Sequence, residues 1–208
     1  MESPLRANSP AVIETFRWDG VAFARLPAHL ARARATCARL GLPFNKPAIH
    51  AALANAPAGQ PARTRLLIAP DGPSVSFAEM PAVATEWRVA LHPTPLSAAD
   101  PWLQMKTTQR PVYDAARAAL PAGIDEYLFL NERGELCEGT ITNLFIRRDG
   151  TLLTPARHCG LLPGILRAEL LAEGQAVEAV LHLHDLTNAN IFLGNALRGL
   201  VPARLATP

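Results

Sequence analysis

Apolar and polar residues alternate in the first third of the chain in a way that predicts β-strands joined by turns. Residues 11–18 carry β-branched and aromatic side chains, an Asp-Gly pair follows, and residues 21–26 resume the pattern. We therefore expect a β-hairpin at the start of the chain. Residues 63–69 and 74–77 flank another Asp-Gly turn and predict a second hairpin.

Helical spacing of apolar residues alternates with further strand-like runs along the rest of the chain. The first helix is expected to end at Gly41, and the last is expected to begin after the Pro-Gly pair at 163–164. The predicted helices cover residues 29–40, 46–56, 113–120 and 165–172. The remaining predicted strands cover residues 86–91, 125–130, 141–147, 151–154, 176–180, 190–193 and 200–205.

Mixed hairpins and helices without an internal repeat predict an α+β fold in two lobes. Pro, Ser and Asp are concentrated in residues 92–103, which makes this stretch the best candidate for a linker. We place a small α/β lobe at residues 1–95, a linker at 96–105 and a larger α/β lobe at 106–208.

Composition excludes several classes of protein. The chain has 208 residues, of which 49% are hydrophobic and 18% charged, so it can bury a core and is not intrinsically disordered. A net charge of +2 is too small to indicate nucleic-acid binding, and no apolar run approaches the length of a membrane span. The first ten residues lack the apolar segment of a secretory signal, and the three cysteines are widely spaced. We therefore expect a cytoplasmic protein.

Only two lysines occur, Lys46 and Lys106, so chemistry that needs a side-chain amine has two candidates. Lys106 follows Met105 and has no acidic neighbour nearby in the sequence. An amine in apolar surroundings tends to lose its charge and become a nucleophile. The alternative is a solvated lysine whose stem lies along the surface. Lys46 looks like a loop residue and is a poor catalytic candidate.

Two further segments carry candidate binding groups. A helix beginning at Ile165 leaves the backbone N–H groups of Ile165 and Leu166 unpaired, and such an end binds phosphate. Glu138 precedes Gly139 and an apolar strand containing Asn143, so its carboxylate is a candidate for a protected site. The alternatives are an ordinary loop-to-helix junction, a turn-forming Glu-Gly pair and a satisfied polar contact at Asn143.

The order of these segments resembles the class IV aminotransferase family, the fold-type IV enzymes that depend on pyridoxal 5′-phosphate (PLP). The resemblance runs from about residue 14 to residue 205. It rests on five ordered motifs: Glu14-Thr-Phe-Arg17, His29-Leu-Ala-Arg32, Lys106-Thr-Thr-Gln-Arg110, Glu138-Gly-Thr-Ile-Thr-Asn-Leu-Phe145 and Leu162-Pro-Gly-Ile-Leu-Arg167. It implies a two-lobed architecture like that of D-amino-acid aminotransferase, with the cofactor site carried by the larger lobe.

The resemblance also implies roles for the matching residues. Lys106 matches the lysine that binds PLP covalently and later moves protons. Glu138 matches the carboxylate that pairs with the pyridine nitrogen and keeps it protonated. Arg32 matches the arginine that binds the cofactor phosphate, and the backbone N–H groups of Ile165 and Leu166 match further donors to that phosphate.

Details near the C-terminus resemble one member of the family. Asn195 occupies a phosphate-side position at which the aminotransferases usually carry Thr or Ser, and Asn143 completes the expected cofactor-binding set. Asn195-Ala-Leu197, the following residues 199–202 and Arg110 are similar to aminodeoxychorismate lyase. The resemblance therefore implies a lyase that converts 4-amino-4-deoxychorismate to p-aminobenzoate and pyruvate in folate biosynthesis.

Substrate roles follow from the same resemblance. Lys106 would remove the proton from the amine-bearing carbon, and Thr15 would donate to the leaving group. Candidates for the substrate carboxylates are Arg17, Arg110 and Arg198, because a planar guanidinium suits bidentate recognition. The alternatives are an ordinary surface role for each arginine, an aminotransferase for branched-chain or D-amino acids, and a non-catalytic scaffold that keeps the fold.

One departure from the family concerns the start of the chain. The N-terminal stretch that family members carry before the segment matching Glu14 is missing, so we expect a shortened small lobe. The resemblance implies a homodimer, with aminodeoxychorismate synthase as a candidate partner and with no nucleic-acid or membrane partner. His182 and His184 lack a third ligand at suitable spacing, so no metal site is expected.

Overall fold

Residues 10–206 are described by the computed structural model and fold into two compact units. Within this range, the first unit consists of residues 10–82 and 105–109, and the second consists of residues 83–104 and 110–206. The predicted α+β class is confirmed. The division into a small lobe at 1–95 and a larger lobe at 106–208 stays a prediction. The linker expected at 96–105 stays a prediction, and here residues 96–104 belong to the second unit.

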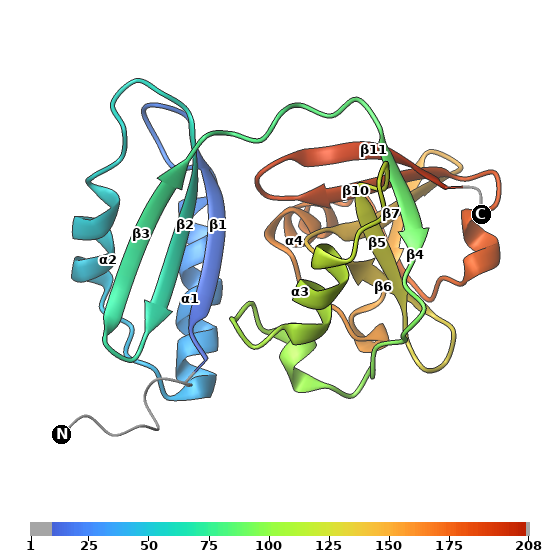
Figure 1. Cartoon of the computed structure of the whole chain (residues 1–208), viewed down its shortest axis with the longest axis horizontal. Coiled ribbons are helices and arrows are strands. Elements are labelled where there is room, and N and C mark those ends of the chain that lie inside the picture. Colours follow the sequence, from blue (N-terminus) through green and yellow to red (C-terminus); the bar gives the residue numbers. More distant parts are fainter. Residues whose placement is uncertain (1–9, 207–208) are drawn as a thin grey trace. The chain divides into compact units, whose positions relative to one another are not determined.

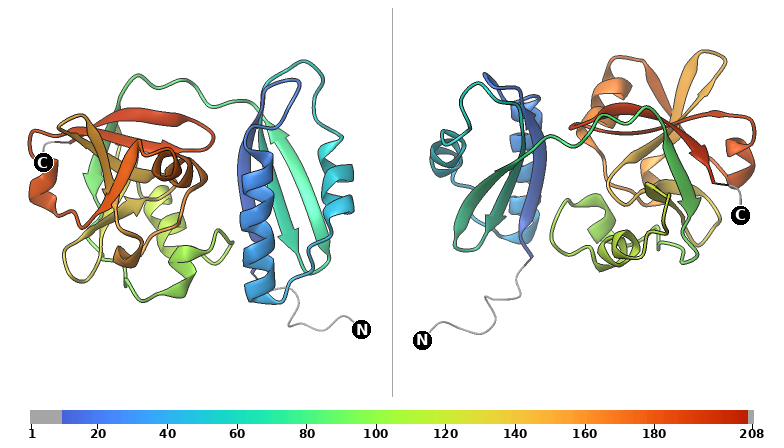
Figure 2. Two further views of the ribbon diagram at one scale, coloured as in Figure 1. Left: turned by 180° about the vertical axis from the view of Figure 1, so that it is seen from behind. Right: turned by 45° about the horizontal axis from the view of Figure 1, so that its top comes forward.

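The first unit is a three-stranded antiparallel sheet with two helices on one face (Figures 1 and 2). Its strands, in the order β1-β2-β3, are β1 (Val12–Trp18), β2 (Ala62–Ala69) and β3 (Gly72–Ala78). Its helices are α1 (Leu26–Leu40) and α2 (Lys46–Leu53).

Alternate strand residues of the first unit form its core against the two helices. Phe16 of β1 and Leu66 of β2 are fully buried in one cluster with Ile49 of α2. Gly41 ends α1 in the left-handed region at φ 65°, and the Asn45 side chain accepts a backbone hydrogen bond that caps α2. The sheet face opposite the helices carries both apolar residues, such as the paired Ile13 and Leu67, and polar or charged ones.

The hairpin expected across residues 11–18 and 21–26 does not form, so this prediction was wrong. β1 pairs along its whole length with β2, and the second segment contributes a single bridge between Trp18 and Phe23. The chain then enters α1, whose first turn contains Pro27. The edge of β1 that does not face β2 carries the bridge at Trp18, and the main chain of residues 106–108 pairs with the same edge at Val12.

The second unit is built on an eight-stranded sheet in the order β10-β11-β4-β5-β6-β7-β8-β9 (Figure 1). β10 also pairs with β7, so the strands from β10 through β11, β4, β5 and β6 to β7 close into a ring. The strands are β4 (Trp87–Leu91), β5 (Glu126–Leu130), β6 (Leu136–Gly139), β7 (Asn143–Arg148), β8 (Thr151–Pro155), β9 (Ala176–Ala179), β10 (Asn190–Asn195) and β11 (Gly199–Leu205).

Two α-helices and three short 3-10 helices complete the second unit. They are α3 (Pro111–Ala118), α4 (Ile165–Ala172), η2 (Pro101–Gln104), η3 (Arg157–Cys159) and η4 (Leu183–Leu186). Leu128 and Leu144 belong to a core contributed by strands around the ring. Their neighbours Phe129 and Phe145 point the other way, the first into a cluster with Tyr113 of α3 and the second into one with α4.

Most element positions expected from the sequence are confirmed to within a few residues. The hairpin of β7 and β8 turns at Asp149 and Gly150, both with positive φ (49° and 81°), as an Asp-Gly hairpin turn requires. Strand β6 was missed, because its four residues are too short to display a period. No helix within residues 10–206 combines the length and apolar character needed to cross a membrane.

We expect Leu144→Ala to lower the free energy of unfolding by about 2–5 kcal/mol, because Leu144 is fully buried in the ring core and truncation leaves a cavity. Urea denaturation followed by circular dichroism measures the change. Val177→Ala on β9, where the side chain is exposed, is the control and should change this free energy by less than about 0.5 kcal/mol. Equal losses in both variants would contradict the assigned core.

Candidate active site

The backbone around Lys106 is fixed against the outer edge of β1. The Ile13 N–H donates to the Lys106 carbonyl (2.8 Å), and the Thr108 N–H donates to the Ala11 carbonyl (2.9 Å). Between these two hydrogen bonds, Val12 and Thr107 form an antiparallel bridge. Lys106 is half-buried, whereas Thr107 is fully buried. The candidate lysine is therefore attached to the small sheet through its own main chain.

Strand alternation places Lys106 on the same sheet face as two other predicted residues. Val12 and Phe16 of β1 are buried toward the helices, so Thr15 and Arg17 lie on the opposite face. Val12 and Thr107 are directly opposed and point the same way, which leaves Lys106 on the side of Thr15. The structure thus brings Lys106, Thr15 and Arg17 together on the helix-free face.

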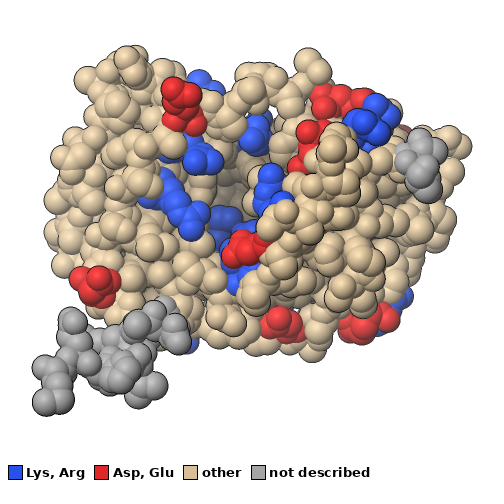
Figure 3. Space-filling view, viewed as in Figure 1, with Lys and Arg blue, Asp and Glu red and all other residues tan. Residues whose placement is uncertain are grey.

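Two further arginines, Arg63 and Arg65 of β2, lie on this face and were missed in the sequence. Arg63 is directly opposite Arg17 and Arg65 is directly opposite Thr15 in the β1–β2 register. Both arginines are exposed, while Thr64 between them is buried. Figure 3 shows basic side chains gathered over this sheet. The signal was the Arg-Thr-Arg alternation, which puts both arginines on one side of a strand.

On the helix-facing side of β1, Glu14 forms a buried cluster with His29 and Arg32 of α1. Arg32 donates from Nε to Glu14 Oε1 (2.8 Å) and from Nη2 to Glu14 Oε2 (2.6 Å), and His29 Nδ1 lies 2.6 Å from the same Oε2. Burial by itself raises the pKa of Glu14, but Arg32 and His29 bring it below its ordinary value. Glu14 therefore orients the guanidinium of Arg32, the candidate phosphate ligand.

His29 completes this cluster in its neutral form. Its ring is 1% exposed, and Nε2 has no hydrogen-bond partner among the described residues. A proton on Nδ1 is shared with Glu14, whereas a second proton on Nε2 would be buried without an acceptor. Burial accordingly lowers the pKa of His29. Glu14, His29 and Arg32 stand in two motifs of the sequence, but nothing beyond a carboxylate in the apolar phase of β1 indicated that their side chains meet.

In the second unit, the carboxylate of Glu138 is buried at the end of β6. The Tyr113 hydroxyl donates to Oε1 (2.7 Å), as does the Leu162 N–H (3.1 Å), and the Asn143 amide donates to Oε2 (3.3 Å). Burial and the neighbouring Glu138 raise the pKa of Tyr113 well above its ordinary value, so Tyr113 remains a donor. The three donors hold a carboxylate in a fixed orientation inside the protein.

Asn143 connects Glu138 to the start of α4. It is paired with Glu138 across β6 and β7, and its amide also donates to the Leu162 carbonyl (2.9 Å). No side chain caps α4, whose first residue is Ile165. A Cβ on Gly164 would overlap the Asn143 side-chain oxygen, so only glycine fits immediately before the helix. The structure therefore brings Glu138, Asn143 and the Ile165–Leu166 backbone together.

Asn195 and Arg110 both bind the turn that follows Glu138. The Asn195 amide donates to the Ile141 carbonyl (3.2 Å), and Arg110 Nη2 donates to the Thr140 carbonyl (2.8 Å). Arg110 also pairs with Asp114 (2.8 Å). These contacts give both residues a structural role at the turn in addition to any contact with a ligand.

Other sequence candidates have different surroundings. The Arg198 guanidinium stacks on the Trp87 ring, 5.2 Å from its centre. Arg167, the last residue of the helix-start motif, is 3% exposed and donates to the Pro155 carbonyl (2.8 Å) and to Glu178, so it supports the fold.

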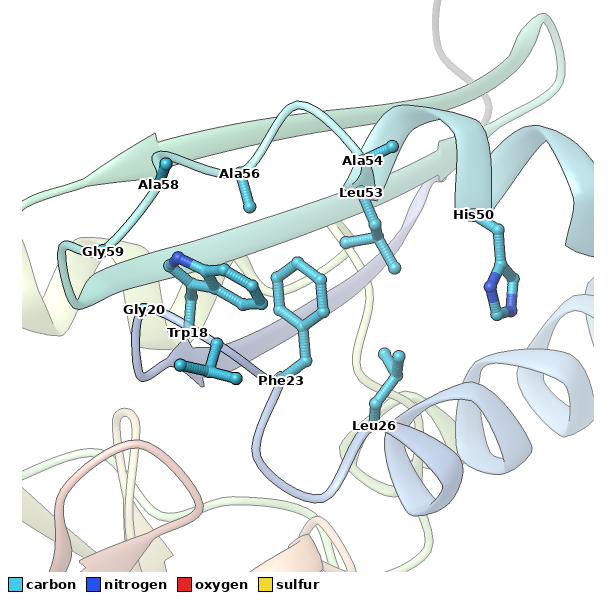
Figure 4. Close-up of a pocket in the computed structure, with 11 residues that line it drawn as sticks. Trp18, Gly20, Phe23, Leu26, His50, Leu53, Ala54, Ala56, Ala58 and Gly59 are labelled. Carbon is cyan, nitrogen blue, oxygen red and sulfur yellow. The ribbon is translucent and has the colours of Figure 1, made fainter.

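A separate pocket of about 450 Å³ opens on the first unit (Figure 4). It is lined largely by apolar side chains, with Trp18, Phe23, Leu26, Leu53 and His50 around it. The Trp18 indole nitrogen donates to the Pro57 carbonyl (2.8 Å). None of the predicted site residues lines this pocket.

The family model described as amino-transferase class IV matches residues 11–206. The chain belongs to the class IV aminotransferase family. Enzymes of this family depend on PLP, and the family includes both aminotransferases and aminodeoxychorismate lyases. The expected fold-type IV architecture and the expected cofactor are thereby confirmed at the level of the family.

Three relatives illustrate the range of this class IV family. A crystal structure from Mesorhizobium loti, provisionally named an amino-acid aminotransferase, is 43% identical, with a TM-score of 0.90 and coverage of 95% of this chain and 100% of that one. A Methanocaldococcus jannaschii protein, provisionally named a branched-chain-amino-acid aminotransferase, is 38% identical over 87 residues, 39% of this chain and 30% of that protein. The aminodeoxychorismate lyase of Saccharomyces cerevisiae is 30% identical over 141 residues, 58% of this chain and 37% of the lyase. The matched stretches thus span about a third of these two curated relatives.

The described residues fit PLP. The buried, pre-oriented Glu138 carboxylate suits a protonated pyridine nitrogen. The uncapped start of α4, where Gly164 leaves no room for a Cβ, suits a phosphate bound by backbone N–H groups. Lys106, whose main chain is fixed by hydrogen bonds to β1, is the candidate for the amine.

We expect the pH dependence of stability to reveal the neutral state of His29. Its pKa is lowered on folding, so the unfolded chain binds the proton first and stability falls as the pH drops through 6.5 toward the folded pKa. A single proton contributes a slope of at most about 1.4 kcal/mol per pH unit. Urea denaturation between pH 7.5 and 5.5 should give a smaller slope for His29→Phe than for the native chain. His50→Phe, at an exposed histidine, is the control, and equal slopes in all three proteins would contradict a buried neutral His29.

Proposed function

We propose that the protein is a PLP-dependent 4-amino-4-deoxychorismate lyase that forms p-aminobenzoate and pyruvate. The observation that carries this proposal is the turn at Asn195, in the segment that resembles the lyases. Asn195 Oδ1 accepts from the N–H groups of Leu197 (3.1 Å) and Arg198 (3.0 Å), while its amide donates to the Ile141 carbonyl. A threonine or serine would have to make all three contacts from one hydroxyl oxygen, whereas asparagine divides them between an amide oxygen and an amide nitrogen. The turn is therefore built on both ends of the side chain that separates the lyase-like sequence from the aminotransferase-like one.

The arginines of the first unit support an acidic substrate. The proposed substrate carries two carboxylates, one on the ring and one on the enolpyruvyl group. Arg17, Arg63 and Arg65 lie on the same sheet face as Lys106. Guanidinium groups bind carboxylates through paired hydrogen bonds, so this face suits recognition of a dicarboxylate. Arg110 and Arg198 of the second unit are further carboxylate candidates in the proposal.

Each proposed catalytic residue has a defined task. Bound PLP supplies an electron sink for the electrons released when the substrate loses a proton. The Lys106 amine takes that proton from the amine-bearing carbon, Thr15 donates a hydrogen bond to the departing enolpyruvyl oxygen, and Glu138 holds a proton at the pyridine nitrogen. Loss of the enolpyruvyl group as pyruvate leaves an aromatic ring, which makes the step favourable.

The remaining proposed residues bind the cofactor. Arg32, oriented by Glu14, and the backbone N–H groups of Ile165 and Leu166 bind the phosphate. Asn143 orients Glu138 from the neighbouring strand, and Asn195 supports the turn between them.

An aminotransferase that acts on amino acids is the second candidate function. It is favoured by the 43% identical Mesorhizobium loti structure and by the branched-chain-amino-acid aminotransferase relative. The same Lys106, Glu138 and Arg32 would serve that reaction, so these residues do not separate the two candidates. The alternatives differ in whether the substrate loses pyruvate or passes its amino group to the cofactor.

The setting of the enzyme is part of the proposal. We infer that it works as a homodimer in the cytoplasm, within folate biosynthesis, on substrate made by aminodeoxychorismate synthase. The resemblance to class IV enzymes supports the dimer, and the three buried free thiols, Cys37, Cys137 and Cys159, are consistent with a reducing compartment.

We expect the PLP-loaded protein to convert 4-amino-4-deoxychorismate to equal amounts of p-aminobenzoate and pyruvate, measured by liquid chromatography and a coupled pyruvate assay. Lys106→Ala removes the proton-transfer group and should abolish both products. If native protein binds PLP but forms neither product, and if amino donors convert the cofactor to its pyridoxamine form, the results would favour the aminotransferase. Product formation by Lys106→Ala would contradict the role of Lys106 in either reaction.

We expect Arg65→Ala to raise KM by about tenfold or more with a smaller effect on kcat, because a charge-assisted carboxylate contact contributes about 1.5–3 kcal/mol to binding. Arg65→Lys should restore only part of the loss, since an ammonium cannot bind bidentately. Arg34→Ala on the exposed side of α1 is the control. Unchanged KM in Arg65→Ala would remove the β2 arginines from substrate recognition.

A further inference from the structure

The turn at residues 140–142 lies at the centre of the second unit's candidate groups. It joins β6 to β7, so Glu138 and Asn143 stand at its two ends and face each other across the strands. A displacement of this turn would alter the spacing of both side chains at once.

The same turn also binds the two candidates that come from distant parts of the chain. Its Thr140 carbonyl accepts from Arg110, which immediately precedes α3, and its Ile141 carbonyl accepts from Asn195, which ends β10. Four of the candidate residues therefore take their positions from three residues of backbone.

The turn also contacts Glu126 of β5, a fully buried carboxylate that has no role in the proposed mechanism. Glu126 Oε2 accepts from the Ile141 N–H (3.2 Å) and the Thr142 hydroxyl (3.3 Å). Oε1 accepts from the Thr140 hydroxyl and from the N–H of Tyr127 (3.1 Å). Every residue of the turn thus donates to this one side chain.

Arg117 of α3 supplies the charge that a buried carboxylate needs. Its Nη1 lies 3.4 Å from Glu126 Oε1 and 3.1 Å from the Thr140 hydroxyl oxygen. Burial raises the pKa of Glu126, while the Thr140 hydrogen bond and Arg117 oppose that rise. Four donors, Thr140, Ile141, Thr142 and the Tyr127 N–H, match the roughly four acceptor sites of an ionised carboxylate, and Arg117 adds a longer, charged contact.

Close packing also leaves this turn little freedom. A Cβ on Gly139 would lie 2.5 Å from the Thr142 hydroxyl oxygen and 3.0 Å from Glu126. Only glycine lets the end of β6 approach the carboxylate this closely.

We propose that Glu126 is a positioning residue: its buried carboxylate fixes the turn at residues 140–142 and thereby sets Glu138 and Asn143 for the cofactor. The inference rests on the proposed cofactor roles of Glu138 and Asn143, and it holds equally for a lyase and for an aminotransferase.

Glu126→Gln tests this inference with almost no change in volume. The glutamine amide can be placed in two orientations, and each sets its NH₂ group against a backbone N–H, that of Tyr127 or that of Ile141. A backbone N–H can only donate, so one hydrogen bond is lost in either orientation. The turn should therefore loosen while the fold stays intact.

The experiment measures two quantities besides activity. The first is the affinity for PLP, from the change in visible absorbance on titration, and we expect it to be about tenfold weaker in Glu126→Gln. The second is hydrogen exchange of the Ile141 amide without cofactor, which should become faster. Thr140→Val removes the hydroxyl that donates to Glu126 and keeps the shape of the side chain. It should shift both quantities in the same direction as Glu126→Gln, but by a smaller amount. If Glu126→Gln does not fold, Thr140→Val decides the test.

Thr154→Val is the matched control. Thr154 of β8 is also fully buried, and its hydroxyl donates to the Leu144 carbonyl (2.8 Å), away from the turn. This variant should lose stability without a change in PLP affinity or in Ile141 exchange.

A double variant separates positioning from general weakening. If Glu126 acts through Glu138, then Glu126→Gln should weaken PLP binding less in a Glu138→Gln background than in the native chain. The inference is overturned if Glu126→Gln binds PLP within twofold of the native affinity and leaves the hydrogen exchange of the Ile141 amide unchanged. If Glu126→Gln does not fold, the same two results in Thr140→Val would overturn it. Failure of the native protein to bind PLP would instead overturn the proposed function. In that case, faster exchange of the Ile141 amide in Glu126→Gln would still support the role of Glu126 in fixing the turn.

Discussion

Three carboxylates, Glu14, Glu126 and Glu138, lie buried in strands, and the groups that solvate them organise both units of the protein. An ionised carboxylate inside a protein is unfavourable unless hydrogen bonds and opposite charge replace water. Each of the three recruits donors from elements distant in sequence: Glu14 from α1, Glu126 from the turn and α3, and Glu138 from α3, β7 and the loop before α4. Satisfying these charges therefore also fixes which elements meet.

The three clusters serve different tasks in the proposed chemistry. Glu138 is the carboxylate proposed to face the cofactor, and its three donors hold it in one orientation. Glu14 orients the guanidinium of Arg32 through two hydrogen bonds. Because His29 is neutral, the cluster carries no second buried positive charge. Glu126 contacts none of the proposed reacting groups, but it fixes the turn that lies between Glu138 and Asn143. Such outer carboxylates set geometry rather than take part in bond changes.

Family membership and reaction depend on different parts of the chain. The class IV assignment rests on a match of the family model over residues 11–206. The lyase proposal rests on much less, chiefly on Asn195 and its turn and on the arginines of β1 and β2. Cofactor chemistry is shared by both reactions, so only the groups that touch the rest of the substrate can separate them.

Sequence patterns alone predicted the α+β class and most strands and helices, because periodicity and Asp-Gly turns are local signals. The candidate residues came from short local motifs and from the family resemblance that those motifs carry. The patterns failed for the first hairpin, since the chain enters α1 at Leu26 after one bridge, and the segments that pair with both edges of β1, β2 and residues 106–108, are distant in sequence. Arg63 and Arg65 became candidates only once the register set them opposite Arg17 and Thr15. The environments of Glu14, Glu126 and Glu138 were equally hidden, because donors to a buried charge come from whichever elements fold against it.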